Sequence, residues 1–145
     1  MFTNILIPTD GSKLAEAAAE NAVAFARDAK ASVVFVYVIE PFHIFTTDSE
    51  KLTIAKDDYD RFANAQAAKF LSDVEARARL QGVVSRTVKV RSDQVHTAIV
   101  DAAIENGCDL IAMGSHGRGS VASLLIGSVT AKVLSHSRIP VLVYR

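Results

Sequence analysis

The apolar residues of the chain alternate between short runs with strand character and longer stretches with helical spacing. Strands are expected at residues 4–8, 32–40, 84–91, 109–113 and 140–144. Helices are expected at about residues 12–30, 55–80, 93–107 and 128–136. Strict alternation of strand and helix is typical of a parallel sheet with right-handed crossovers. The pattern therefore predicts one α/β domain, residues 1–145, with an open, doubly wound, five-stranded parallel sheet and helices on both faces.

Local signals indicate the helix ends and the buried helix faces. Ser12 is expected to cap the first helix and Ser92 or Asp93 the third. The large apolar residues expected to face inward include Leu14, Phe62 and Leu134. Residues 41–53 lack a clear period, so an irregular connection is expected there, a candidate lid or partner surface.

Composition and charge narrow the class of protein. Half of the 145 residues are hydrophobic and 22% are charged, which suits an ordinary globular domain. Sixteen basic residues balance sixteen acidic ones, so the positive field that nucleic-acid binding needs is absent, and neither DNA nor RNA is an expected partner. The longest apolar run, residues 33–39, is too short to span a membrane. The chain begins without a secretory-signal pattern, so a cytoplasmic location is expected.

Loop chemistry distinguishes two possible strand orders. In the order 2-1-3-4-5 a ligand crevice would lie between the first and third strands, where loop 91–94 offers nothing to hold a phosphate. In the order 3-2-1-4-5 the crevice lies between the first and fourth strands, where the acidic loop 8–12 meets the glycine-rich loop 114–120. The second order is preferred because it brings both loops to one cleft.

The glycine-rich loop is the strongest functional signal. Gly114, Gly117 and Gly119 are expected to take positive φ and to let backbone N–H groups approach an anion. Gly127 precedes the last helix, whose N-terminus offers a second anion site with the hydroxyls of Ser128 and Thr130 as donors. A tight turn would explain any one of these glycines, but their combination favours phosphate. Neither the Gly-x-Gly-x-x-Gly fingerprint after the first strand nor the lysine of a P-loop is present.

The spacing Gly114-x2-Gly117-x9-Gly127-Ser128 resembles the nucleotide motif of the universal stress protein family, in its ATP-binding branch. Segments 5–12, 113–119 and 140–143 are also similar to that family. The resemblance implies a Rossmann-like fold of the adenine nucleotide alpha hydrolase type and a regulatory role in the stress response. It also implies ATP, or AMP or ADP, as ligand, with or without Mg²⁺, and a homodimer formed through the last strand, residues 140–145.

By that resemblance, Asp10 would face the ribose hydroxyls or a nucleotide-bound Mg²⁺, and the backbone of Val38 would meet adenine. The base and sugar pocket would be lined by Pro8, Thr9 and Met113. The phosphates would be wrapped by the loop residues Gly114, Ser115, His116, Gly117, Arg118, Gly119 and Ser120. The phosphate site would be completed by Gly127, Ser128, Val129 and Thr130.

Three functions stay open from the residues. The leading hypothesis is a regulatory nucleotide-binding protein; the alternatives are a slow ATPase that uses an Asp10-bound metal, and a dimeric interaction module with an empty cleft. No catalytic residue is assigned, because the sequence offers His116 no carboxylate partner. The sequence spacing of His43, His96 and His136 makes no metal set. The one cysteine, Cys108, is expected to be a small residue at the edge of the core.

Overall fold

The computed structural model describes residues 1–43, 46–117 and 125–145. Its elements are β1 (Asn4–Pro8), α1 (Lys13–Ala29), β2 (Ser32–Ile39), α2 (Ser49–Leu80), β3 (Ser85–Arg91), α3 (Val95–Glu105), β4 (Leu110–Gly114), α4 (Ser128–His136) and β5 (Val141–Tyr144). The expected strand–helix alternation is confirmed. No helix in the described ranges is both long and apolar enough to cross a membrane.

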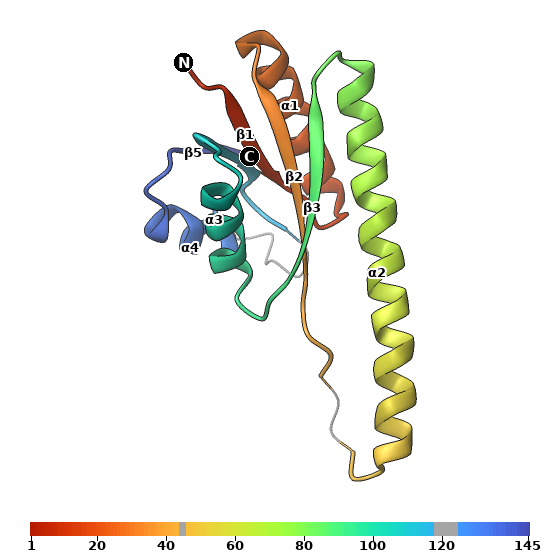
Figure 1. Ribbon diagram of the computed structural model, residues 1–145. Coiled ribbons are helices and arrows are strands. Elements are labelled where there is room, and N and C mark those ends of the chain that lie inside the picture. Colours follow the sequence, from red (N-terminus) through yellow and green to blue (C-terminus); the bar gives the residue numbers. More distant parts are fainter. Residues whose placement is uncertain (44–45, 118–124) are drawn as a thin grey trace.

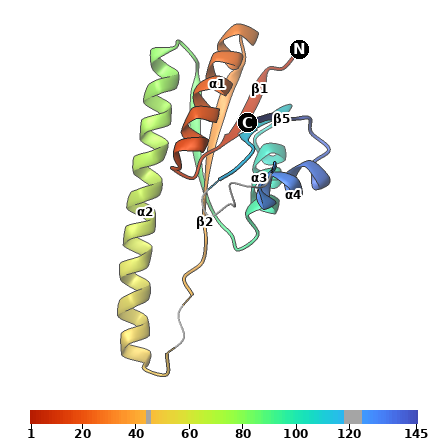
Figure 2. The ribbon, with the colours of Figure 1, turned by 180° about the vertical axis from the view of Figure 1, so that it is seen from behind.

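The strands form one parallel sheet in the order β3-β2-β1-β4-β5, which confirms the preferred order. Helices α1 and α2 cover one face of the sheet, and α3 and α4 cover the other (Figure 1). The view from behind shows the same division (Figure 2). The first and fourth strands are therefore neighbours, and the loops that follow them meet at one edge of the sheet.

Strand β2 explains why the core is divided into two parts. Its apolar run is buried on both sides, as expected for a strand inside a parallel sheet. Successive side chains of a strand point to opposite faces. Phe35 and Tyr37 therefore pack toward α1 and α2, whereas Val34 and Val36, which alternate with them, pack toward α3 and α4. Cys108, expected as a small residue at the edge of the core, is buried in the second part, and burial raises the pKa of its thiol to about 11.

Most residues expected on the inner faces of the helices, such as Ala22 and Val133, are buried, but three of the large ones are exposed. Leu14 is 58% exposed, Phe62 63% and Leu134 42%. Helix α1 buries mainly a stripe of alanines that begins at Ala15, and Leu14 lies one residue, about a quarter of a turn, outside it. Leu134 stands in the same relation to the buried Val133.

Helix α2 begins at Ser49, earlier than the expected start near Ala55, so residues 49–53 are helical and not irregular. Asp48 caps it by accepting hydrogen bonds from the backbone N–H groups of Glu50 and Lys51 at 3.1 and 3.2 Å. The N-terminal half extends beyond the sheet (Figure 1), and the first buried residue of the helix is Ala67. This overhang leaves Phe62 without a covering layer and removes the apolar stripe that would have revealed the first turns.

The caps of the other helices differ in how well they were predicted. Ser12 caps α1, as expected, by accepting a hydrogen bond from the Ala15 N–H at 3.2 Å. Neither Ser92 nor Asp93 caps α3, which has Gln94 at that position without a side-chain cap. Ser92 instead accepts a hydrogen bond from the Gln94 N–H at 3.0 Å, which forms a turn before the helix and delays its start.

Candidate functional site

A cleft opens where β1 and β4 separate. Strand β1 pairs with β4 only at Ile5 and Leu6, but it pairs with β2 as far as Pro8. The next residue, Thr9, also bonds toward β2, because its N–H donates to the Val36 carbonyl at 2.9 Å. The end of β1 therefore follows β2 and leaves a space of about 510 Å³, counted out to its open mouth, beside β4. A crevice at the carboxyl ends of strands, where the strand order reverses, is the usual ligand site of such sheets.

The cleft brings together residues that are far apart in the sequence. The residues of the predicted site that line it are Pro8, Thr9, Asp10, Val38, Met113, Gly114, His116, Gly117 and Thr130. Four further lining residues were not predicted: Ala15, Val36, Val95 and Ile99. The two from α3 could not be placed from sequence, because their position at the cleft depends on how α3 packs across the sheet.

The remaining predicted residues lie outside the lining or outside the described ranges. Ser115 is buried behind the loop, Gly127 is buried at the start of α4, Ser128 is exposed and Val129 is half-buried. Arg118, Gly119 and Ser120 lie outside the described residues.

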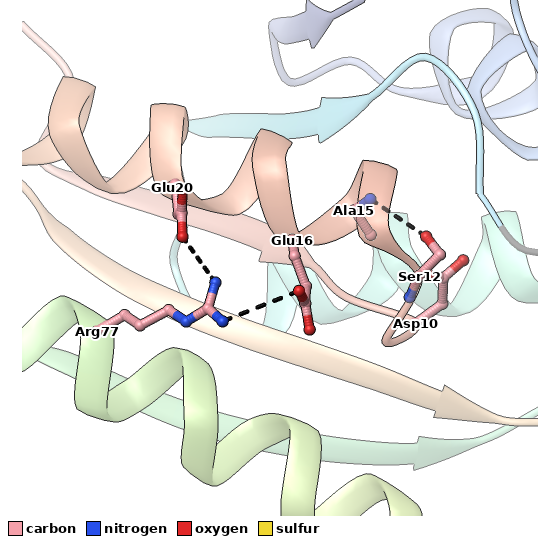
Figure 3. Close-up of polar contacts among 6 residues, drawn as sticks. All are labelled: Asp10, Ser12, Ala15, Glu16, Glu20 and Arg77. Carbon is pink, nitrogen blue, oxygen red and sulfur yellow. Dashed lines mark hydrogen bonds and ion pairs between the residues drawn. The ribbon is translucent and has the colours of Figure 1, made fainter.

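The acidic loop and the glycine loop touch at Asp10 and Gly117. A Cβ placed on Gly117 would lie only 2.6 Å from Asp10 Oδ2, so any other residue there would require the Asp10 carboxylate to move. The other carboxylate oxygen, Oδ1, accepts a hydrogen bond from the Ser12 N–H at 2.9 Å. Figure 3 shows Asp10 beside Ser12 at the start of α1. The carboxylate is thus oriented at the polar end of the cleft.

The expected positive φ at Gly114 and Gly117 is wrong. The described glycines with positive φ are Gly11, Gly82 and Gly107. Gly114 continues β4 in strand conformation, and a Cβ on it would meet Ala18 Cβ at 3.4 Å, an ordinary contact. At position 117 the relevant feature is the close approach of the Asp10 carboxylate, and not the backbone conformation.

Thr9 is the least satisfied polar residue of the site. It is 5% exposed, and its Oγ1 has no hydrogen-bond partner among the residues that the structure describes. A buried hydroxyl without a partner costs about 1–3 kcal/mol. Because Thr9 lines the cleft, a ligand there could supply the missing partner.

The glycine loop is fastened to β5 and to α4 by its own backbone. The Ser115 N–H donates to the Tyr144 carbonyl at 2.7 Å, and the Ser115 carbonyl accepts from the Gly127 N–H at 2.6 Å. The Thr130 hydroxyl donates to the Gly114 carbonyl at 2.9 Å, so its hydrogen points to the loop in this structure. The Ser115 hydroxyl lies 3.0 Å from His116 Nδ1. These bonds fix the end of β4 relative to the start of α4.

Helix α2 supports the acidic loop from behind, which the sequence did not reveal. Gly11 has φ +79°, and a Cβ on it would lie 2.3 Å from Phe70 Cε2, so the Phe70 ring sits directly on the loop. That ring also stacks on Tyr37 of β2, with centroids 6.1 Å apart. Helix α2 also contacts α1, through the ion pair of Arg77 with Glu20 at 2.7 Å, which Figure 3 draws. Exposed ion pairs of this kind contribute little to stability, so the packing of Phe70 is the more important contact between α2 and the segment that carries the acidic loop.

The described part of the chain holds no cluster of three or more His, Cys, Asp or Glu side chains that could bind a metal ion. Side chains of the described residues therefore do not form a metal centre of three or more ligands by themselves. Asp10 is the carboxylate of the cleft lining. A metal there would need most of its oxygen ligands from a bound molecule and from water, as Mg²⁺ commonly does beside phosphates.

Comparison with known proteins assigns the family. The chain matches the model of the universal stress protein family over residues 1–145. A universal stress protein of Thermus aquaticus is 34% identical over 145 residues, with 100% of both chains covered. One from Methanocaldococcus jannaschii is 31% identical over 157 residues, covering 100% of this chain and 96% of the relative. The solved structure of universal stress protein UspA from Lactobacillus plantarum has a TM-score of 0.80 at 26% identity, covering 99% of this chain and 97% of that one. The chain belongs to the universal stress protein family.

Proposed function

We propose that this protein binds an adenine nucleotide, ATP in the first place, in the cleft between β1 and β4, and acts as a regulatory nucleotide-binding protein in the stress response. The observation that carries the proposal is the buried Oγ1 of Thr9, which has no hydrogen-bond partner among the described residues and lies in the wall of a cleft that joins an acidic loop to a glycine loop. A buried polar group without a partner in the wall of an open cleft favours a ligand that hydrogen-bonds to it.

The cleft has an apolar part that suits a base. Val36, Val38, Ile99 and Met113 are lining residues that belong to or pack against the core on the α3 and α4 side. Flat, weakly polar rings gain from burial against such side chains. Adenine would lie here, next to the backbone of Val38 near the end of β2.

The opposite part suits a sugar and phosphates. The Asp10 carboxylate can accept hydrogen bonds from ribose hydroxyls, or contact a nucleotide-bound Mg²⁺. Gly127 precedes α4 and has no side chain to cap it, so the first-turn N–H groups and the exposed Ser128 hydroxyl are suited to phosphate oxygens. Under the proposal, the base, the ribose and the phosphates would follow one another from the apolar wall towards the start of α4.

Two solved structures with this fold hold adenine nucleotides. One is described as a universal stress protein in complex with cAMP (TM-score 0.73, 23% identity). Another is the Archaeoglobus fulgidus universal stress protein in complex with dAMP (TM-score 0.69, 21% identity). At these identities the likeness establishes a common fold, and the ligands belong to those proteins. For this chain the choice of ligand rests on the chemistry of the cleft.

A homodimer through residues 140–145 is part of the proposal. Strand β5 ends the sheet, so one of its edges has no neighbouring strand in the described ranges, and all four of its residues are partly exposed. An unpaired edge can pair with the same edge of a second copy. Light scattering of the purified protein is expected to give the mass of a dimer, and a monomer at micromolar concentration would contradict this part.

The ligand is tested by its release and by titration. Purified protein is denatured, the released small molecules are identified by mass spectrometry, and nucleotide-free protein is titrated with ATP, ADP, AMP and GTP. An adenine nucleotide is expected in the released fraction or as a calorimetric signal, with weaker binding of GTP. The absence of both would overturn the proposal. Phosphate release that is lost in Asp10→Ala would favour the slow ATPase instead.

A matched pair of variants tests the phosphate end. Ser128→Ala is expected to weaken ATP binding several-fold while leaving adenosine binding unchanged, because only the phosphates reach the start of α4. Ser135 lies near the other end of the same helix, where its hydroxyl donates to the Ala131 carbonyl at 2.9 Å, so Ser135→Ala serves as control. Equal ATP affinity in Ser128→Ala and the control would argue against phosphates at α4.

A further inference from the structure

Two histidines that lie far apart in the sequence meet on the surface between α3 and α4. His96 stands in the first turn of α3 and His136 is the last residue of α4. Their ring centroids are 5.1 Å apart, with the ring planes inclined at 49°. The two helices lie side by side in both ribbon views (Figures 1 and 2), so this pair bridges them on the face opposite α1 and α2.

The tautomer of His136 is set by its backbone neighbour. His136 Nδ1 lies 2.7 Å from the Lys132 carbonyl oxygen. A carbonyl can only accept a hydrogen bond, so Nδ1 must carry the hydrogen. In the neutral ring, Nε2 is then left with its lone pair available. Histidines that bind metals commonly donate their other ring N–H to a carbonyl or carboxylate in this way.

We infer that His96 and His136 form a two-histidine site for a transition-metal dication of the Cu²⁺, Ni²⁺ and Zn²⁺ class, which bridges α3 and α4. Two imidazoles bound to one tetrahedral ion at about 2.0 Å place their ring centroids roughly 5 Å apart. The observed centroid separation of 5.1 Å matches this spacing. Water or another small ligand would fill the remaining coordination positions.

The site lies beside the proposed nucleotide cleft without being part of it. Val95 and Ile99 of α3 and Thr130 of α4 line the cleft, whereas neither histidine does. An ion held by His96 and His136 would join the two helices that form this wall. Metal binding is then expected to stabilise the α3–α4 contact, whether or not a nucleotide binds.

The positive charge of Lys132 is expected to weaken metal binding at this site, so its removal is a test with a predicted sign. Burial, His136 and Lys132 together lower the pKa of His96, so the Lys132 ammonium lies close enough to act on this ring. The same positive charge repels a bound dication. Lys132→Gln is therefore expected to bind the metal several-fold more tightly than the unmodified protein.

The experiment is a titration of nucleotide-free, full-length protein with Cu²⁺, Ni²⁺, Zn²⁺ and Mg²⁺, followed by calorimetry and by the thermal midpoint. One ion per chain is expected, with Cu²⁺ tightest and no binding of Mg²⁺, which prefers oxygen ligands. His96→Ala and His136→Ala are each expected to lose affinity at least tenfold. His43 is exposed and distant in the sequence, and His43→Ala is expected to bind as tightly as the unmodified protein.

The spectrum of Cu²⁺ bound to the unmodified protein gives a readout that does not require a variant to fold. Electron paramagnetic resonance of the unmodified protein is expected to show two nitrogen ligands, reduced to one in either alanine variant. Equal Cu²⁺ affinity in His96→Ala, His136→Ala and His43→Ala, or a spectrum without coordinated nitrogen, would overturn the inference. Asp10→Asn should bind the ion unchanged, which separates this site from the proposed nucleotide cleft.

Discussion

Gly117 and Asp10 approach each other so closely that a Cβ on Gly117 would lie 2.6 Å from Asp10 Oδ2. The contact joins the loop after β4 to the loop after β1 across the mouth of the cleft. Gly117→Ala is expected to turn the carboxylate away from the Ser12 N–H and to cost about 1 kcal/mol of stability, at the lower end of overpacking costs, because the cleft is open. Under the proposed function, ATP affinity falls about tenfold, about 1.4 kcal/mol. Urea unfolding and calorimetry measure the two effects.

Gly114 supplies the control for that substitution. A Cβ there would meet Ala18 Cβ at 3.4 Å, and its φ is not left-handed, so Gly114→Ala is expected to unfold at nearly the same urea concentration as the unmodified protein. If Gly114→Ala destabilised the protein as much as Gly117→Ala, the loss could not be attributed to the contact with Asp10.

Thr9→Val is expected to move stability and binding in opposite directions. Valine has the shape of threonine but lacks the buried Oγ1 that has no partner among the described residues, so the ligand-free protein should gain about 1 kcal/mol. The same change removes a proposed ligand contact, and ATP affinity should fall about tenfold. Thr87→Val, at an exposed position of β3, is the control and should change neither quantity. A loss of stability in Thr9→Val would show that the hydroxyl already has a partner.

Gly11 and Gly82 separate backbone strain from steric overlap. Both have positive φ, +79° and +73°, but only Gly11 is covered by a side chain, that of Phe70. Gly82→Ala is expected to cost about 1 kcal/mol from φ alone. Gly11→Ala should cost about 3 kcal/mol, because overpacking against Phe70 is added. Combining Gly11→Ala with Phe70→Leu should recover part of the difference in urea unfolding; no recovery would show that Phe70 is not the obstacle.

The Asp109 carboxylate makes the stability of the folded protein depend on pH. Burial alone would raise the pKa of this carboxylate, but hydrogen bonds from Thr3 and Asn4 outweigh burial and lower it from 3.8. A lowered folded-state pKa stabilises the protein above the unfolded value, and this stabilisation is lost as the pH falls through the folded one. Asp109→Asn is therefore expected to lower the thermal midpoint near neutral pH and to flatten its decline below about pH 4. If the thermal midpoint of Asp109→Asn fell as steeply with pH as that of the unmodified protein, the acid sensitivity would have to come from other carboxylates.

The fold was predictable because its signals are local. Apolar runs such as β2 and the Ser12 cap are readable in a few consecutive residues, and loop chemistry then selected the strand order. The start of α2 was missed because its first turns lie beyond the sheet and carry no apolar stripe. The misplacement of Leu14 reflects an error of one residue in the phase of an alanine-rich face.

The site was predictable only as far as its loops. Thr9, Asp10, His116 and Gly117 follow β1 and β4 and line the cleft as expected, because the ends of parallel strands share one edge, whereas Ser115 does not line it. Contacts between distant segments were not readable: Phe70 lies on Gly11 through the packing of α2, and His96 meets His136 across two helices. Gly117 was noticed for the wrong reason, since its φ is not left-handed and its distinguishing feature is the close approach of the Asp10 carboxylate.

The division of the core by the sheet has a practical consequence for engineering. The apolar wall of the cleft lies with α3 and α4, whereas the larger set of buried side chains, around Phe35, lies with α1 and α2. Thermostabilising substitutions often reduce function when they stiffen the ligand site itself. In this protein they can be confined to the α1 and α2 side, for example at the exposed Phe62, so that heat tolerance can be raised without changing the apolar wall of the cleft.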